Sequence, residues 1–309
     1  MRRYRHILAV LEPGSDKNTA LTRALEIANF SPDVRITAMI AVYDFSNELT
    51  SVLDISTQLE LKNRLIEVNE QMIDQELKKI DVHVDIETKI IWQRSITRAI
   101  VDEINHGDYD LLIKSANNSE HDLLHSLLVA PLDLKLLRHS PIPVIIAKEH
   151  AWEKNATILV ALNFEDHSEQ NLYRMMNITL LRHAQVLAKM TGCTIHLINA
   201  AVPINQSTLI EMPGFSPDLY SEALYNHNNG KMEAFAKKHK IPPENCHISI
   251  GQAGDVIAHY AQELNANSVL VGNFARSGII GTLVGNICEQ IGDELKCDMF
   301  VISAPHKDE

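Results

Sequence analysis

Two copies of one apolar segment lie about a domain's length apart in the chain, and this repeat constrains the fold more than any other feature. Residues 7–11 read Ile-Leu-Ala-Val-Leu, and residues 158–162 read Ile-Leu-Val-Ala-Leu. Each segment is apolar throughout, as parallel strands are when helices cover both faces of their sheet. With 309 residues, the chain has the length of two such domains.

The same order of expected strands and helices follows each copy. In the first half we predict strands at residues 7–11, 34–42, 83–92, 110–113 and 144–147, and helices near 20–28, 58–80 and 96–105. In the second half we predict strands at residues 158–162, 194–201, 246–250, 268–271 and 299–303, and helices near 176–188, 217–239 and 255–264. Strands that alternate with helices predict a parallel, doubly wound α/β sheet with right-handed crossovers. We therefore expect two tandem five-stranded domains, residues 1–149 and 150–309, joined by a short charged segment.

Charge and hydropathy exclude several classes of partner. The formal net charge is −12, and an acidic surface repels phosphate backbones, so we expect no nucleic-acid partner. No stretch approaches the ~20 apolar residues of a membrane span, and the apolar run at residues 7–11 is too short for a signal peptide. The four cysteines lie in the second half without a CxxC pair, as expected of free, buried thiols in a reducing cytoplasm.

A glycine-rich segment, residues 272–286, follows the fourth expected strand of the second half. Ligands of open α/β sheets bind beyond the carboxyl ends of the strands, where backbone N–H groups at a helix start can hold phosphate. Glycines allow the backbone to approach an anion closely, and Arg276 offers a charge-assisted contact. Glycine-rich turns of this kind also occur without a ligand, so both interpretations stay open here.

This segment resembles the nucleotide loop of the universal stress protein family, written G-x2-G-x9-G-[ST]. Gly272 and Gly285 match that pattern, whereas Ala275 and Asn286 stand at the other two positions. Ala275 adds a Cβ where the backbone needs the freedom of glycine. Asn286 lacks the hydroxyl that faces a phosphate in the family, although its amide can still donate.

The ends of the first strands depart from the family as well. Members that bind ATP usually have Asp there, but this chain has Asn163 in the second half and Glu12 in the first. The first half has no glycine in residues 113–125, and we predict no nucleotide site there. In the second half, the resemblance implies that ATP is a candidate cofactor held by seven residues: Asn163, Val271, Gly272, Ala275, Arg276, Gly285 and Asn286.

The resemblance covers nearly the whole chain and is closest to the tandem two-domain subgroup called universal stress protein E. Four segments are similar to that subgroup: residues 42–46, 136–144, 210–217 and 281–291. The resemblance implies a cytoplasmic stress-response protein without an established reaction. It also implies two domains related by a pseudo-twofold axis, last strands that pair or pack near that axis, and a homodimer of the tandem chain.

Other candidate features carry less chemistry. His121 and His125 are four residues apart, but two histidines do not complete a tetrahedral metal site, so we predict no metal. Glu165 and Asp166 suit a helix cap or a magnesium ion beside a nucleotide. The inserts at residues 203–225 and 45–55 are apolar, and they are expected to line an apolar ligand pocket or the seam between the domains.

Three functions remain open from the sequence. The first is a non-enzymatic stress-response protein that binds a small ligand, either a nucleotide or an apolar molecule, or a protein partner. The second is an ATP-binding protein that uses residues 272–286 of the second domain. The third is a slow nucleotide hydrolase, against which the loop offers no evident activated base.

Overall fold

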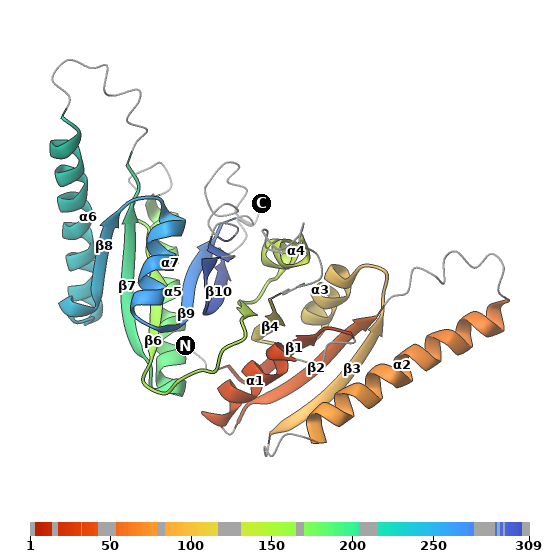
Figure 1. Cartoon of the computed structure of the whole chain (residues 1–309). Helices are drawn as coiled ribbons and strands as arrows, with labels where there is room; N and C mark the ends of the chain where they lie inside the picture. Colours follow the sequence, from red (N-terminus) through yellow and green to blue (C-terminus); the bar gives the residue numbers. More distant parts are fainter. Residues whose placement is uncertain are drawn as a thin grey trace. The chain divides into compact units, whose positions relative to one another are not determined.

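The structure is a computed structural model that divides into two compact units, with the division between Glu149 and His150 (Figure 1). It describes residues 4–13, 18–31, 33–42, 54–78, 84–116, 131–164, 170–203, 216–274, 288, 291–292 and 294–304. Among these described residues, no helix is both long and apolar enough to cross a membrane.

The first domain contains one parallel sheet with the strand order β3-β2-β1-β4-β5. Its elements are β1 (His6–Leu11), α1 (Thr19–Asn29), β2 (Arg35–Val42), α2 (Ile55–Lys78), β3 (Asp85–Trp92), α3 (Ile96–His106), β4 (Leu111–Ser115), α4 (Pro131–His139) and β5 (Val144–Ala147). The central strands are apolar and buried, as expected when helices cover both faces of a sheet.

The second domain repeats this arrangement with the strand order β10-β9-β6-β7-β8. Its elements are β6 (Thr157–Ala161), α5 (Gln170–Thr191), β7 (Thr194–Ala201), α6 (Pro217–His239), a 3-10 turn (Pro243–Asn245), β8 (Cys246–Ile250), α7 (Ala253–Glu263), β9 (Ala266–Asn273) and β10 (Asp298–Ser303). The predicted pair of doubly wound, five-stranded parallel sheets is therefore confirmed. The pairing of the two last strands stays a prediction.

Handedness decides which helices share a face of the second sheet. The connections from β6 to β7 and from β7 to β8 run in one direction across the sheet, whereas the connection from β8 to β9 runs back. Right-handed crossovers therefore place α5 and α6 on one face and α7 on the other.

Helix α6 begins at Pro217 after Ser216, whose hydroxyl accepts a hydrogen bond from the backbone N–H of Leu219 at 3.5 Å.

Helix α4 was not among the predicted elements. Pro131 stands at its first position, where a missing N–H costs nothing because the first N–H groups of a helix have no intrahelical partner. Strand β9 is also longer than predicted. Gly272 and Asn273 extend it because they pair with Ile302 and Ser303 of β10.

Candidate functional site

The carboxyl edge of the second sheet is held by a network of asparagines. The backbone N–H of Asn163, which follows β6, donates to Asn177 Oδ1 at 3.1 Å, and Asn177 Nδ2 donates back to the Asn163 carbonyl at 2.7 Å. Asn199 Nδ2 on β7 donates to the Leu162 carbonyl at 2.8 Å. Asn177 and Asn199 are both buried, so they fix the chain where it leaves β6.

Gly272 lies on β9, next to β6, and close packing against α5 explains why this position is a glycine. A Cβ built at this position would lie 2.6 Å from Met176 Cγ, so α5 approaches β9 closely over the glycine. The neighbouring Val271 is 2% exposed and belongs to the core. The structure thus brings three of the seven predicted site residues, Asn163, Val271 and Gly272, to one edge of the sheet. The other four, Ala275, Arg276, Gly285 and Asn286, lie outside the described residues.

The equivalent edge of the first domain contains an ion pair between a buried lysine and a partly exposed glutamate. Strand registers align Lys114 with Val271, and Glu12 with Asn163. Lys114 is 1% exposed, its Nζ lies 3.1 Å from Glu12 Oε1, and it donates to the Ser115 carbonyl at 2.8 Å. A charged pair therefore lies at the switch point of the first sheet, whereas the second sheet has an amide and an apolar side chain at the same two positions.

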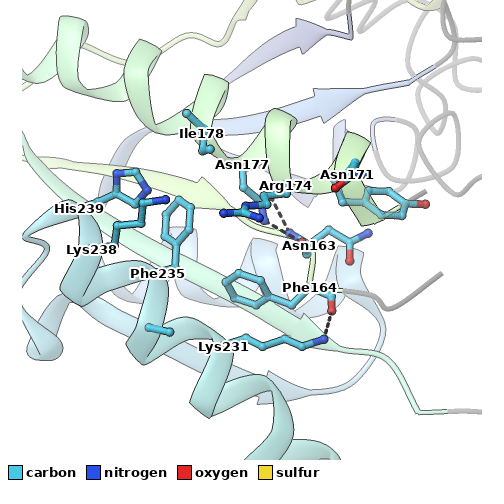
Figure 2. Close-up of a pocket in the computed structure, with 12 residues that line it drawn as sticks. Asn163, Phe164, Asn171, Arg174, Asn177, Ile178, Lys231, Phe235, Lys238 and His239 are labelled. Atoms are coloured by element: carbon cyan, nitrogen blue, oxygen red, sulfur yellow. Dashed lines mark hydrogen bonds between the residues drawn. The ribbon is translucent and has the colours of Figure 1, made fainter. Parts of the chain in front are cut away.

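A cavity of about 350 Å³ adjoins Asn163 and lies between α5 and α6 (Figure 2). Its lining comprises three asparagines, three aromatic rings, three basic side chains, one histidine, Ile178 and Ala234. The volume is in the usual range of small-molecule sites, about 300–1,000 Å³. Because α5 and α6 share one face of the sheet, the space between them opens beside the end of β6.

Helix α6 supplies one wall of this cavity through residues that share a helix face. Lys231, Phe235, Lys238 and His239 recur at a helical spacing of three to four residues. Lys231 Nζ donates to the Phe164 carbonyl at 2.7 Å, which ties α6 to the segment after β6. The ring centroid of Phe235 lies 6.2 Å from that of Phe164 and 4.4 Å from that of His239, so the three rings form a continuous aromatic wall.

The cavity is lined by basic side chains, whereas the chain as a whole has a formal net charge of −12. Arg174, Lys231 and Lys238 line it, and none of the described residues that line it is acidic. Burial lowers the pKa of His239, and the charges of Lys238 and Arg182 lower it further, so His239 is neutral near pH 7. Its Nε2 atom is buried and has no hydrogen-bond partner.

No metal site emerges from the described part of the chain, where no group of three or more His, Cys, Asp or Glu side chains is arranged to hold an ion. His196 Nδ1 and His247 Nε2 form a pair at 2.9 Å on neighbouring strands. All four cysteines are free, and three of them are buried, whereas Cys246 is half-buried. His121, His125, Glu165, Asp166 and most of the two apolar inserts lie outside the described residues.

The sequence reasoning missed the cavity, although one signal for it was present. Basic residues at positions 231 and 238 share a helix face with Phe235, on a helix whose bounds, 217–239, were predicted correctly. What the pattern did not show is that this face lines one cavity together with Arg174 and Ile178 of α5. That arrangement depends on the crossover handedness and on the spacing between the two helices.

Comparison with known protein families gives two matches, one in each of the two domains of the chain. The profile of the universal stress protein family matches residues 3–148 and 155–303. Universal stress protein E of Photorhabdus laumondii is 31% identical over 305 residues, covering 98% of this chain and 96% of that protein. The protein of the same name from Escherichia coli K12 is 32% identical over 306 residues, covering 98% of this chain and 95% of its own.

Solved structures resemble both domains together. A Pseudomonas aeruginosa UCBPP-PA14 protein assigned to the universal stress proteins has a TM-score of 0.66 at 26% identity, covering 97% of this chain and 93% of its own. A universal stress protein from Archaeoglobus fulgidus has a TM-score of 0.65 at 16% identity, covering 98% of this chain and 97% of its own, and it shares the fold.

Proposed function

Because the chain belongs to the universal stress protein family, we propose that it is a non-enzymatic stress-response protein that binds one small molecule in its second domain. The tandem subgroup indicated by the sequence motifs is also that of the relatives named universal stress protein E. Their names support the stress-response role. The free thiols support a cytoplasmic location, and a homodimer of the tandem chain stays a prediction from the resemblance.

The observation that carries ligand binding is the cavity of about 350 Å³ beside Asn163. It adjoins the end of β6, the region where open α/β sheets bind their ligands. In the first domain, the Lys114–Glu12 pair lies at the corresponding edge, which supports a single site per chain rather than two.

Filling the cavity is expected to abolish ligand binding without unfolding the domain. Ala234 lines the cavity from the exposed side of α6, so Ala234→Trp places an indole in the space without disturbing the core. We expect wild-type chain, purified from cells under mild conditions, to carry one small-molecule mass in native mass spectrometry. That mass should be lost in Ala234→Trp.

The matched control is Ala223→Trp, an exposed position on the same helix outside the lining. It should retain the bound mass. Bare wild-type protein, or equal retention of the mass in both tryptophan variants, contradicts a ligand site between α5 and α6.

A second candidate ligand is ATP, bound through residues 272–286. The contrast between Lys114 and Val271 favours it, because the first sheet has an ion pair at its switch point, whereas the second sheet has an apolar side chain at the position of Lys114. Asn163 and Gly272 stand at that edge. Titration calorimetry with ATP should then give one site per chain, abolished by Gly285→Trp and retained in Ala234→Trp. The absence of heat at millimolar ATP contradicts this candidate.

A further inference from the structure

We propose that the cavity between α5 and α6 selects a small organic anion. Its negative group contacts Lys238 and Arg174, and its apolar or aromatic body packs against Phe164 and Phe235. The inference rests on the proposed function, because it names the chemical class of the ligand in the same cavity. It is separate from the glycine-rich loop, since every residue it uses lies on α5, on α6 or directly after β6.

Uncompensated positive charge is the first support. Neither Arg174 nor Lys238 forms an ion pair with a carboxylate anywhere in the part of the chain that the structure describes, although the chain carries 40 acidic residues against 28 basic ones. Both side chains are exposed at the mouth of the cavity. Basic side chains that line a concave site raise the local concentration of anions. Because the rest of the protein is acidic, the positive charge of this cavity both attracts anions and favours them over neutral molecules.

The aromatic wall is the second support. Phe164 and Phe235 are half-buried, with ring centroids 6.2 Å apart and inclined at 62°. Ile178 of α5 lines the cavity with them (Figure 2). Small-molecule sites typically combine such apolar walls with a few polar groups that fix orientation. Inorganic phosphate would use only the basic side chains, so the two phenylalanines indicate an organic body on the anion.

His239 supplies a polar contact at the α6 end of the cavity. Its Nε2 is buried and has no hydrogen-bond partner, while its ring packs on Phe235 with centroids 4.4 Å apart. A neutral imidazole has one donor and one acceptor nitrogen. With the proton on Nε2, the ring donates to an oxygen of the bound anion and satisfies an atom that is otherwise left unpaired in the protein.

The test uses two fluorescent probes of similar size that differ in charge. The probe 8-anilinonaphthalene-1-sulfonate is an aromatic anion, and N-phenyl-1-naphthylamine is the matched neutral molecule. Both are titrated into the full-length chain and its variants. We expect Lys238→Met and Arg174→Met each to weaken the binding of the sulfonate about tenfold, as the loss of a charge-assisted contact implies. The affinity for the neutral probe should stay within about twofold, since its contacts are with the rings.

Lys237→Met is the matched control, because Lys237 is exposed on the same helix and does not line the cavity. It should leave the affinity for both probes unchanged, whereas Phe235→Ala should weaken both. Equal losses of sulfonate affinity in Lys237→Met and Lys238→Met would show that only the general charge of the surface matters, and would overturn the proposal. So would unchanged sulfonate affinity in both Lys238→Met and Arg174→Met.

Competition distinguishes the possible sources of the anion. Displacement of the sulfonate by phenyl phosphate indicates an organic phosphate, and displacement by octanoate indicates a carboxylate; either result supports the proposal. Equal displacement by phenol and 1-octanol, the neutral counterparts, overturns it. If Ala234→Trp blocks both probes while the charge variants change neither, the proposed ligand site stands and the anion selectivity fails. If Ala234→Trp blocks neither probe, the site itself fails.

Discussion

Asp298→Ala is expected to lower the free energy of unfolding of the second domain by about 3 kcal/mol. Asp298 begins β10 and is fully buried. One carboxylate oxygen accepts from Trp152 Nε1 at 2.9 Å, and the other lies 3.0 Å from His150 Nε2. Both partners belong to the segment that leads into β6. The substitution removes the carboxylate that accepts from the Trp152 indole N–H and contacts His150, so the segment that leads into β6 loses both of these contacts.

The two tryptophans of the chain make this effect measurable domain by domain. Trp92 lies in the first domain and Trp152 in the second, so a Trp92→Phe background makes Trp152 the sole reporter. We expect the urea midpoint of the Trp152 signal to fall in Asp298→Ala. Asp298→Asn keeps one acceptor oxygen and should recover part of the loss. An unchanged midpoint in Asp298→Ala would show that these contacts do not stabilise the domain.

Acidification is expected to destabilise the second domain before the first. Burial lowers the pKa of His183 to about 4, from an ordinary value near 6.5. Burial also lowers the pKa values of His196, His239 and His247, all in the same domain. A histidine with a lowered folded-state pKa contributes stability that is present above its unfolded pKa and is lost as the pH falls towards the folded value.

For His183 alone, the expected loss is about 2 kcal/mol by pH 5 and about 3 kcal/mol by pH 4. Between pH 6.5 and pH 5, the urea midpoint reported by Trp152 should therefore fall more than the midpoint reported by Trp92. His183→Gln removes the titrating group and should flatten the pH dependence of the second domain. Parallel curves for the two tryptophans, or an unaltered curve in His183→Gln, would contradict the burial of neutral histidine.

The repeat at residues 7–11 and 158–162 was enough to predict the architecture. Continuous apolar strands, helical spacing and turn residues are local patterns, and right-handed crossovers convert their order into a sheet. Residues 217–239 form a helix with the predicted bounds because Ser216 and Pro217 are a start signal written in the sequence. Pro131 was harder to interpret, since a proline stands equally well in a loop and at a helix start.

The candidate site was only partly predictable, because its parts come together through tertiary contacts. Asn163 and Gly272 were found at the sheet edge because they follow or end strands that the pattern identified. Lys114 lies one residue beyond the strand predicted at residues 110–113, and its approach to Glu12 depends on the pairing of β4 with β1. The cavity depends on the distance between α5 and α6, and no periodicity in the sequence reports that distance.

The two domains thus share a fold and differ at the same two positions. Lys114 and Glu12 form a charged pair at the switch point of the first sheet, whereas Val271 and Asn163 stand at the equivalent positions of the second sheet. A basic cavity then adjoins Asn163 in the second domain. Under the proposed function, the duplicated fold has one domain that binds a ligand and one domain with an ion pair at the equivalent edge of its sheet.

The location of a bound probe tests whether the chain has a single ligand site in its second domain. Hydrogen–deuterium exchange of the full chain is measured with and without 8-anilinonaphthalene-1-sulfonate. A ligand site between α5 and α6 predicts slower exchange in peptides that cover residues 170–178 of α5 and 231–239 of α6, with no change in α1 or α2 of the first domain. Unchanged exchange in those two peptides at saturating probe, or equal slowing in α1 and α2, would contradict a single ligand site in the second domain.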